Sequence, residues 1–242
     1  MSVYVYGVTR AGLAAPPGIR GIGDPPARVR TPAYGGLAAV VSAAPDKLRP
    51  RRRDLRAHQD VQLAFAGRGA LLPTRFGAVA ADEEAVLARL REGAGSYAAA
   101  LDRVEGRFEM NLKAAPVEDG IAALVRTDPH VARLRQESRR RPGYDTSVRL
   151  GEAVMAGLRR RALAAAREVA DVLTELADDV APGAEVPGGV LNVSFLVAAD
   201  RVADCRAVVD DLGPQLADRA ELRLAGPLPC YSFCGLAAPA GV

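Results

Sequence analysis

Hydrophobic and polar positions alternate along several short stretches of the chain, and each stretch predicts a β-strand. The clearest is 106–114, where Phe108, Met110 and Leu112 lie on one side and charged or amide side chains on the other. Residues 2–8 are apolar or aromatic on both sides, which predicts a strand with two buried faces. We expect further strands over 27–31 (a short edge strand), 34–42, 70–79 with a bend at Pro73, 190–198 and 221–224.

Apolar residues spaced three and four apart predict helices between these strands. Asp54 is expected to cap a helix over 55–66, and Asp82 is expected to cap a helix that ends near residue 91. A much longer helix is predicted over about 146–180, which contains no proline. Its apolar or small residues form one seam: Val148, Gly151, Met155, Leu158, Ala162, Ala165, Val169, Val172 and Leu176. At about 1.5 Å per residue this helix is roughly 50 Å long, so we expect one end to project or to pack against a partner.

Strands mixed with helices in both halves of the chain predict an α+β fold with two domains. Each domain is expected to have a small mixed or antiparallel sheet covered by helices, with ferredoxin-like features. We predict an N-terminal α+β domain over 1–105, a C-terminal α+β domain over 106–228 that contains the long helix, and a C-terminal tail over 229–242.

Composition narrows the possible functions. The 242 residues are 49% hydrophobic and 25% charged, as in soluble globular proteins, and the net charge of +3 is too small to indicate nucleic acid. The arginine runs at 51–53, 139–141 and 159–161 have no interleaved aromatic residues, which favours solvated faces or contacts with an acidic protein surface. No leader peptide and no apolar run of about 18 residues is visible, so we expect a cytoplasmic protein without a membrane segment.

No residue pattern predicts catalysis, a cofactor or a metal. The sequence contains neither a G-x-S-x-G motif nor a P-loop, and Cys230 and Cys234 have the wrong spacing for a zinc knuckle. His58 follows Asp54 by four residues and could be an oriented base, but no nucleophile motif accompanies it. A structural or capping histidine is the better interpretation. We therefore expect no enzymatic activity.

Three other parts of the chain are candidates for contacts between domains or with a partner. Arg75 and Phe76 follow the bend at Pro73, and Glu109 and Lys113 share the polar side of the 106–114 strand, which suggests a solvated surface or an inter-domain contact. Near the end of the chain, the stretch 226–233 contains two prolines, Tyr231 and Phe233. We expect it to follow a fixed extended path with its rings docked, either on its own domain or on another chain.

Several of these stretches together resemble the GvpL/GvpF family of gas vesicle accessory proteins. The matching segments follow the family's order across almost the whole chain: 4–7 (YVYG), 36–42 (GLAAVVS), His58, 72–77 (LPTRFG), 106–109 (GRFE) with Lys113, 142–144 (PGY), Asn192, and 226–233 (GPLPCYSF). Of these segments, LPTRFG and GPLPCYSF are the most specific. The chain departs from the family pattern at Gln59, Leu228 and Cys230, which affects the exact contacts of the tail.

The resemblance implies a structural, non-enzymatic role in gas vesicle assembly. It implies binding to the small, hydrophobic major shell protein during nucleation or growth of the vesicle, contacts with other accessory proteins, and a location in the cytoplasm and at the gas vesicle. The candidate partner or inter-domain contacts are His58, Arg75, Phe76, Glu109, Lys113, Tyr144, Tyr231 and Phe233. Two alternatives stay open: a ferredoxin-like small-molecule-binding or enzymatic domain using His58, Arg75 and Glu109, and an RNA-binding module using the arginine runs.

Overall fold

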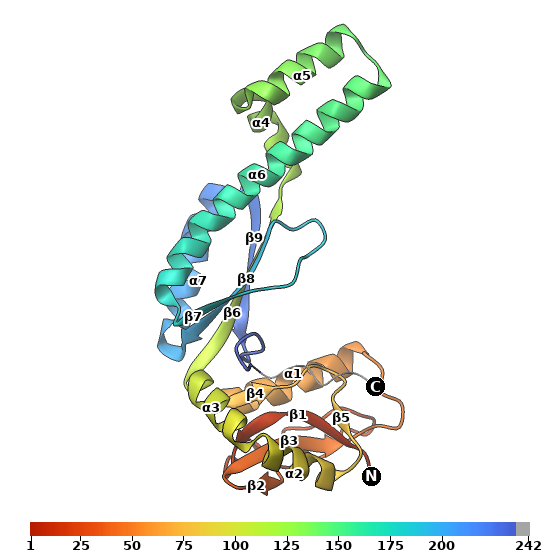
Figure 1. Ribbon diagram of the computed structural model, residues 1–242, viewed down its shortest axis with the longest axis vertical. Coiled ribbons are helices and arrows are strands. Elements are labelled where there is room, and N and C mark those ends of the chain that lie inside the picture. Colours follow the sequence, from red (N-terminus) through yellow and green to blue (C-terminus); the bar gives the residue numbers. More distant parts are fainter. Residues whose placement is uncertain (236–242) are drawn as a thin grey trace. The chain divides into compact units, whose positions relative to one another are not determined.

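The computed structural model describes residues 1–235, which pack into two compact units (Figure 1). The first unit contains Met1–Glu109 together with residues 227–235 from the far end of the chain, and the second unit is Met110–Gly226. The division therefore falls within the strand predicted over 106–114, not before it. The first part of the predicted tail belongs with the first unit, and residues 236–242 lie outside the described residues.

The sheet of the first unit is antiparallel and is built around β1. Its order is β2-β3-β1-β4, and β5 also pairs with β1. The strands are β1 (Val3–Arg10), β2 (Ala33–Tyr34), β3 (Leu37–Ala43), β4 (Leu71–Pro73) and β5 (Val79–Ala80). β1 is largely buried on both sides, as its sequence predicts, with Tyr4 and Tyr6 inaccessible to solvent. Pro73 ends β4 and separates it from β5, because proline cannot continue the hydrogen-bond ladder.

Two glycines turn the strand predicted over 34–42 into a hairpin. Gly35 and Gly36 both have positive φ, 56° and 86°, which is the backbone of the tight turn that joins β2 and β3. The short edge strand predicted over 27–31 is wrong: this segment makes only isolated bridges, Arg20 with Arg28 and Arg30 with Val41.

Three helices complete the first unit: α1 (Arg52–Ala66), α2 (Glu83–Glu92) and α3 (Ala94–Val104). Asp82 caps α2 as predicted, since its side chain accepts a hydrogen bond from the backbone N–H of Ala85 at 2.8 Å. Asp54 does not cap α1, which begins earlier at Arg52. Asp54 is buried in the first turn and accepts a hydrogen bond from the backbone N–H of Gly23 at 3.3 Å.

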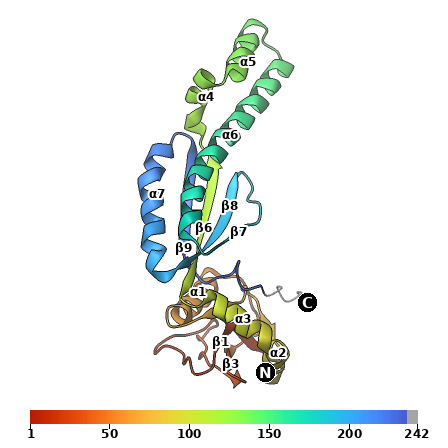
Figure 2. The ribbon, with the colours of Figure 1, turned by 60° about the vertical axis from the view of Figure 1, so that its left-hand side comes forward.

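The second unit has a four-stranded sheet with the order β7-β8-β6-β9. Its elements are β6 (Arg107–Pro116, which begins in the first unit), α4 (Ile121–Thr127), α5 (Pro129–Arg140), α6 (Tyr144–Leu176), β7 (Asp179–Pro182), β8 (Leu191–Ala198), α7 (Val202–Leu216) and β9 (Ala220–Leu228), with short 3₁₀ helices at Glu118–Gly120 and Ala199–Arg201. α6 and α7 lie side by side on one face of this sheet (Figure 2). Met110 and Phe195 from the sheet pack there against Val169 and Leu173 of α6.

Both sheets have the strand order of a ferredoxin-like fold. In the first unit β3 lies beside β1, β2 lies beside β3 at one edge, and β4 lies on the other side of β1. In the second unit β8 lies beside β6, β7 lies beside β8 at one edge, and β9 lies on the other side of β6. In the second unit, helices follow the first and third strands, whereas in the first unit the loop over 11–32 replaces the first helix. The predicted α+β fold with ferredoxin-like features is confirmed.

The long helix is present but ends earlier than predicted. α6 is Tyr144–Leu176, and the residues expected to be its last turn form β7 instead, with Val180 opposite Phe195 of β8. Pairing with β8 satisfies the backbone groups of this segment, and Pro182 could not have continued a helix beyond it.

Candidate functional site

Residues 230–234 are held on the first unit by the side chain of Glu109. The backbone N–H and the hydroxyl of Ser232 each donate a hydrogen bond of 2.8 Å to this carboxylate, and the Glu109 side chain is buried. Cys230 and Phe233 are also buried. The predicted extended path is present only over 226–228, which is the end of β9 (Ala220–Leu228). After it the chain turns, because Phe233 N–H donates to the carbonyl of Cys230 at 3.3 Å.

Gln62 of α1 connects this turn to the sheet. Its carboxamide nitrogen donates to the carbonyls of Tyr6 at 2.7 Å and Thr74 at 2.8 Å, and its oxygen accepts a hydrogen bond from the hydroxyl of Tyr231. Gln62 has no exposed surface, and burial raises the pKa of Tyr231 to about 12. Sequence reasoning missed Gln62, although it lies one helical turn after His58 on the same face.

His58 is a neutral side chain with both ring nitrogens engaged. Its Nε2 lies 3.2 Å from the carbonyl of Thr74, which can only accept, so Nε2 carries the proton. Nδ1 therefore accepts from the hydroxyl of Tyr4 at 2.9 Å, and that hydroxyl accepts in turn from Gly77 N–H at 3.2 Å. Burial lowers the pKa of His58 to about 4. The histidine holds this network together and offers no free nitrogen.

Aromatic rings surround His58. The ring of Tyr6 stacks on it with centroids 5.7 Å apart, and Phe76 meets it edge-on at 5.7 Å. Tyr4 and Tyr6 contact each other at 4.9 Å. The structure therefore brings together two of the predicted contact residues, His58 and Phe76. It adds Tyr4 and Tyr6, for which the sequence predicted only burial in a strand.

The arrangement required by an enzyme at His58, Arg75 and Glu109 is not found among residues 1–235. His58 and Glu109 are buried and hydrogen-bonded within the first unit, whereas Arg75 is exposed. None of the three lines the hollow formed by 183–192 with Arg159, or the hollow formed by 1–3 with Arg30, Ala43 and 82–84. Nothing in this geometry favours the enzymatic alternative.

The remaining predicted contact residues belong to the second unit. Lys113 is exposed on β6, and Tyr144, the first residue of α6, is 84% exposed. Glu109 and Lys113, predicted to share one polar face, therefore lie in different surroundings. Six of the eight candidates belong to the first unit: His58, Arg75, Phe76, Glu109, Tyr231 and Phe233.

The cysteines and acidic residues suggest no metal site. Cys205, Cys230 and Cys234 are free and buried, and burial raises the pKa of both Cys230 and Cys234 to about 12, which keeps them as thiols. Within residues 1–235 no three His, Cys, Asp or Glu side chains are placed to hold a metal ion. No helix in that part of the chain is both long and apolar enough to span a membrane.

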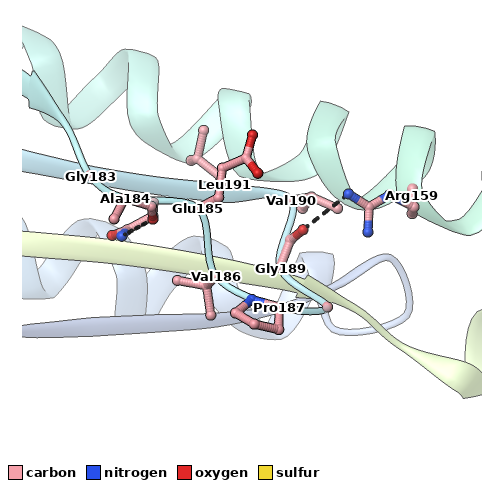
Figure 3. Close-up of a pocket in the computed structure, with 11 residues that line it drawn as sticks. Arg159, Gly183, Ala184, Glu185, Val186, Pro187, Gly189, Val190 and Leu191 are labelled. Carbon is pink, nitrogen blue, oxygen red and sulfur yellow. Dashed lines mark hydrogen bonds between the residues drawn. The ribbon is translucent and has the colours of Figure 1, made fainter.

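A surface hollow in the second unit lies between α6 and the loop that connects β7 to β8 (Figure 3). Arg159 points from α6 to the loop and donates to the carbonyl of Gly189 at 3.2 Å. At the other end of the loop, the carboxamide of Asn192 donates a hydrogen bond of 2.8 Å to the carbonyl of Ala184. Most of the lining is loop backbone with aliphatic side chains, and its polar side chains are Arg159, Glu185 and Asn192.

Comparisons with known proteins agree with the family resemblance. The family described as "Gas vesicle synthesis protein GvpL/GvpF" matches residues 2–235. The chain is 40% identical over 237 residues to "Gas vesicle protein F" of Streptomyces sp. (strain CB03234), covering 96% of this chain and 99% of that protein. It is 32% identical over 256 residues to "Gas vesicle protein L" of the same strain, covering 97% and 93%.

Two crystal structures have the same fold over nearly the whole chain. One is the gas vesicle protein GvpF from Anabaena sp. PCC7120, with a TM-score of 0.79, 20% identity and coverage of 98% of this chain and 99% of that one. The other is GvpF from Microcystis aeruginosa, with a TM-score of 0.75, 22% identity and coverage of 97% and 99%.

Proposed function

Because the chain belongs to the GvpL/GvpF family of gas vesicle synthesis proteins, we propose that it binds the major gas vesicle shell protein during nucleation or growth of the vesicle. The family gives the chain an accessory role in gas vesicle formation and an association with gas vesicles. The observation that carries the proposal is the extent of the family match, residues 2–235, which includes both units and the turn at the end of the chain.

The surface that we propose for this contact is on the first unit, around Arg75 and Tyr231. Arg75 is exposed and directly follows Thr74, whose carbonyl is held by both His58 and Gln62. Tyr231, 38% exposed, is held by the same Gln62. The backbone that carries Arg75 and the Tyr231 side chain are thus both held by buried Gln62. This arrangement suits a protein contact, because the backbone and the tyrosine ring have little freedom left to lose on binding.

The remaining candidates have supporting or separate roles in this proposal. His58, Glu109 and Phe233 are buried and hold the surface in place. The same accessory role implies contacts with other gas vesicle proteins, for which Lys113 on the second unit is an exposed candidate.

Co-expression with the shell protein tests the proposal. We expect the shell protein to co-purify with the tagged chain under mild conditions, and Arg75→Glu to reduce the recovered amount about tenfold, as expected for a central interface residue. Arg68→Glu is the matched control, since Arg68 is also an exposed arginine of the first unit. Failure of the wild-type chain to recover shell protein would reject the binding; equal recovery by Arg75→Glu and wild type would reject this surface only.

A further inference from the structure

α6 carries one apolar face along its whole length, and only half of that face is covered. In its second half, Ala162, Ala166, Val169 and Leu173 lie on this face and are buried in the second unit. Residues spaced three and four apart continue the same face toward the start of the helix. There the side chains are exposed, and we call them the α6 stripe: Tyr144 (84%), Val148 (40%), Gly151 and Met155 (55%).

The helices next to the stripe do not cover it. α4 and α5 pack on the neighbouring side of α6, through Leu150 and Val154, and reach the seam only at Leu158, beyond the last residue of the stripe. The first half of α6 and α5 extend past the sheet and past α7 (Figures 1 and 2). The stripe is therefore an apolar surface about three helical turns long that nothing in the second unit buries.

The same end of the second unit is strongly basic. Residues 121–161 contain ten arginines and four acidic residues. Five of these arginines are exposed and form no ion pair with any of residues 1–235: Arg126, Arg135, Arg139, Arg140 and Arg141. We call residues 121–161 the arginine end.

The rest of the second unit has the opposite charge. Residues 162–226 contain twelve acidic residues and five arginines. Because the second half of α6 packs beside α7, the outward side chains of both helices form one surface, the acidic layer. Its exposed carboxylates without an ion pair in the described chain are Asp171 and Glu175 on α6 and Asp204, Asp210 and Asp211 on α7.

We propose that copies of this chain associate head to tail, with the arginine end and α6 stripe of one copy docked on the acidic layer of the next. Opposite charges on two separate surfaces attract and orient the copies, and burial of the stripe supplies short-range stabilisation. Ala203 and Ala207, exposed on the outward side of α7, leave room for the larger stripe side chains. A second copy is favoured over a nucleic acid because the acidic layer of the same unit repels phosphate.

This geometry predicts an open series and not a closed dimer. The two surfaces differ, so each docked copy still presents a free arginine end and a free acidic layer to further copies. The mean mass should therefore rise steadily with protein concentration. It should fall when salt increases from about 0.05 to about 0.5 M, because screening shortens the range of the attraction.

Two variants, each lacking one surface, test the arrangement in sedimentation equilibrium of the purified full chain. The first combines Arg139→Ser, Arg140→Ser, Arg141→Ser and Met155→Gln, and the second combines Asp204→Asn, Asp210→Asn and Asp211→Asn. All these positions are exposed, so far-UV circular dichroism should match wild type. We expect each variant alone to self-associate about tenfold more weakly or not at all. Mixed, they should form a 1:1 pair that grows no further, since each supplies the surface that the other lacks.

The outcomes separate the possibilities. A 1:1 pair from the mixture supports head-to-tail docking, and Arg89→Ser, an exposed arginine of the first unit, should leave the wild-type mass series unchanged. A wild-type chain that stays monomeric at every concentration and at both salt levels overturns the proposal. So does a closed dimer that both variants retain, or an arginine end that retains RNA, seen by absorbance at 260 nm, while the protein stays monomeric.

Discussion

The hydroxyl of Tyr231 donates a hydrogen bond to the side chain of Gln62, a residue 169 positions earlier in the chain. The same carboxamide donates to the carbonyls of Tyr6 in β1 and Thr74 after β4. One side chain of α1 therefore joins the sheet, the loop that carries Arg75 and the end of the chain. Because buried amide groups are costly to leave unpaired, changes at this point should affect all three.

Removing the Gln62 side-chain amide should destabilise the first unit more than removing the hydroxyl it binds. Tyr231→Phe should lower the unfolding free energy by about 1 kcal/mol, the usual net value of one hydrogen bond. Gln62→Leu should lower it by about 2–3 kcal/mol, because it removes all three hydrogen bonds of the buried carboxamide, to Tyr6, Thr74 and Tyr231. Tyrosine fluorescence in a urea titration reports on this unit, since five of the six tyrosines lie there: Tyr4, Tyr6, Tyr34, Tyr97 and Tyr231.

The double variant completes this experiment. A coupling energy near 1 kcal/mol between the two substitutions is expected if the hydrogen bond is direct. Strictly additive effects would mean that Tyr231 and Gln62 act independently.

Ser232 should control how often the turn over 230–233 opens. Ser232→Ala removes the hydroxyl that donates to Glu109 but keeps the backbone donor. A hydrogen bond to a charged group contributes about 1.5 kcal/mol, so amide hydrogens over 230–235 should exchange about tenfold faster if they exchange through local opening. Ser147→Ala, on α6, is the control. Unchanged exchange in Ser232→Ala would show that the backbone contact alone holds the turn.

His58 should make the first unit less stable as the pH falls from about 6.5 to about 4. Burial places its folded-state pKa at about 4, below the unfolded value of about 6.5. The unfolded chain therefore takes up the proton first, so the stabilisation is complete above pH 6.5 and is lost on acidification. Between pH 7 and pH 5 the unfolding free energy should fall by about 2 kcal/mol through this group.

His58→Gln should remove most of this pH dependence, even if it lowers stability at pH 7. His130→Gln is the matched control, because His130 is exposed at the start of α5. Urea titrations at both pH values give the comparison. A wild-type protein equally stable at pH 7 and pH 5 would contradict the buried neutral histidine.

Gly7→Ala should disrupt the pairing of β1 with β4. A Cβ atom at this position would lie 2.5 Å from the carbonyl oxygen of Leu72, and that oxygen belongs to the backbone, so the strands must separate. We expect a loss of about 2 kcal/mol or more, as for overpacked core sites. Gly95→Ala is the control: its Cβ would meet nothing within 4 Å in α3, and alanine should stabilise that helix by up to about 1 kcal/mol. Equal stability of both variants would contradict the close approach.

Much of the fold could be predicted because it depends on local pattern. The alternation over 106–114, the apolar strand over 2–8 and the three-and-four spacing of α6 reflect side-chain periods that do not depend on distant residues. Two errors, the β2–β3 hairpin and the end of α6, arose where local signals competed. In the first case Gly35 and Gly36 favour a turn, although they lie within an otherwise apolar stretch. In the second case Asp179–Pro182 follows a helical sequence pattern but pairs with β8 as a strand.

The candidate site was less predictable because its contacts join distant parts of the chain. The sequence identified His58, Glu109, Tyr231 and Phe233 as unusual. It grouped His58 with Glu109 only in the enzymatic alternative, and it connected neither of them with Tyr231 or Phe233. Gln62 and Ser232, which make the connections, are ordinary polar residues in their local context.

Residue order was enough to predict the family, the α+β class and the strands and helices whose spacing is regular, because these depend on motifs and on side-chain periods of two and 3.6. Three features appear only once the chain is folded: residues 230–234 pack on the first unit, Glu109 is buried and bonded to Ser232 while Lys113 stays exposed, and half of the α6 seam is uncovered. Each of these depends on which distant surfaces meet, and neither a side-chain period nor a motif contains that information.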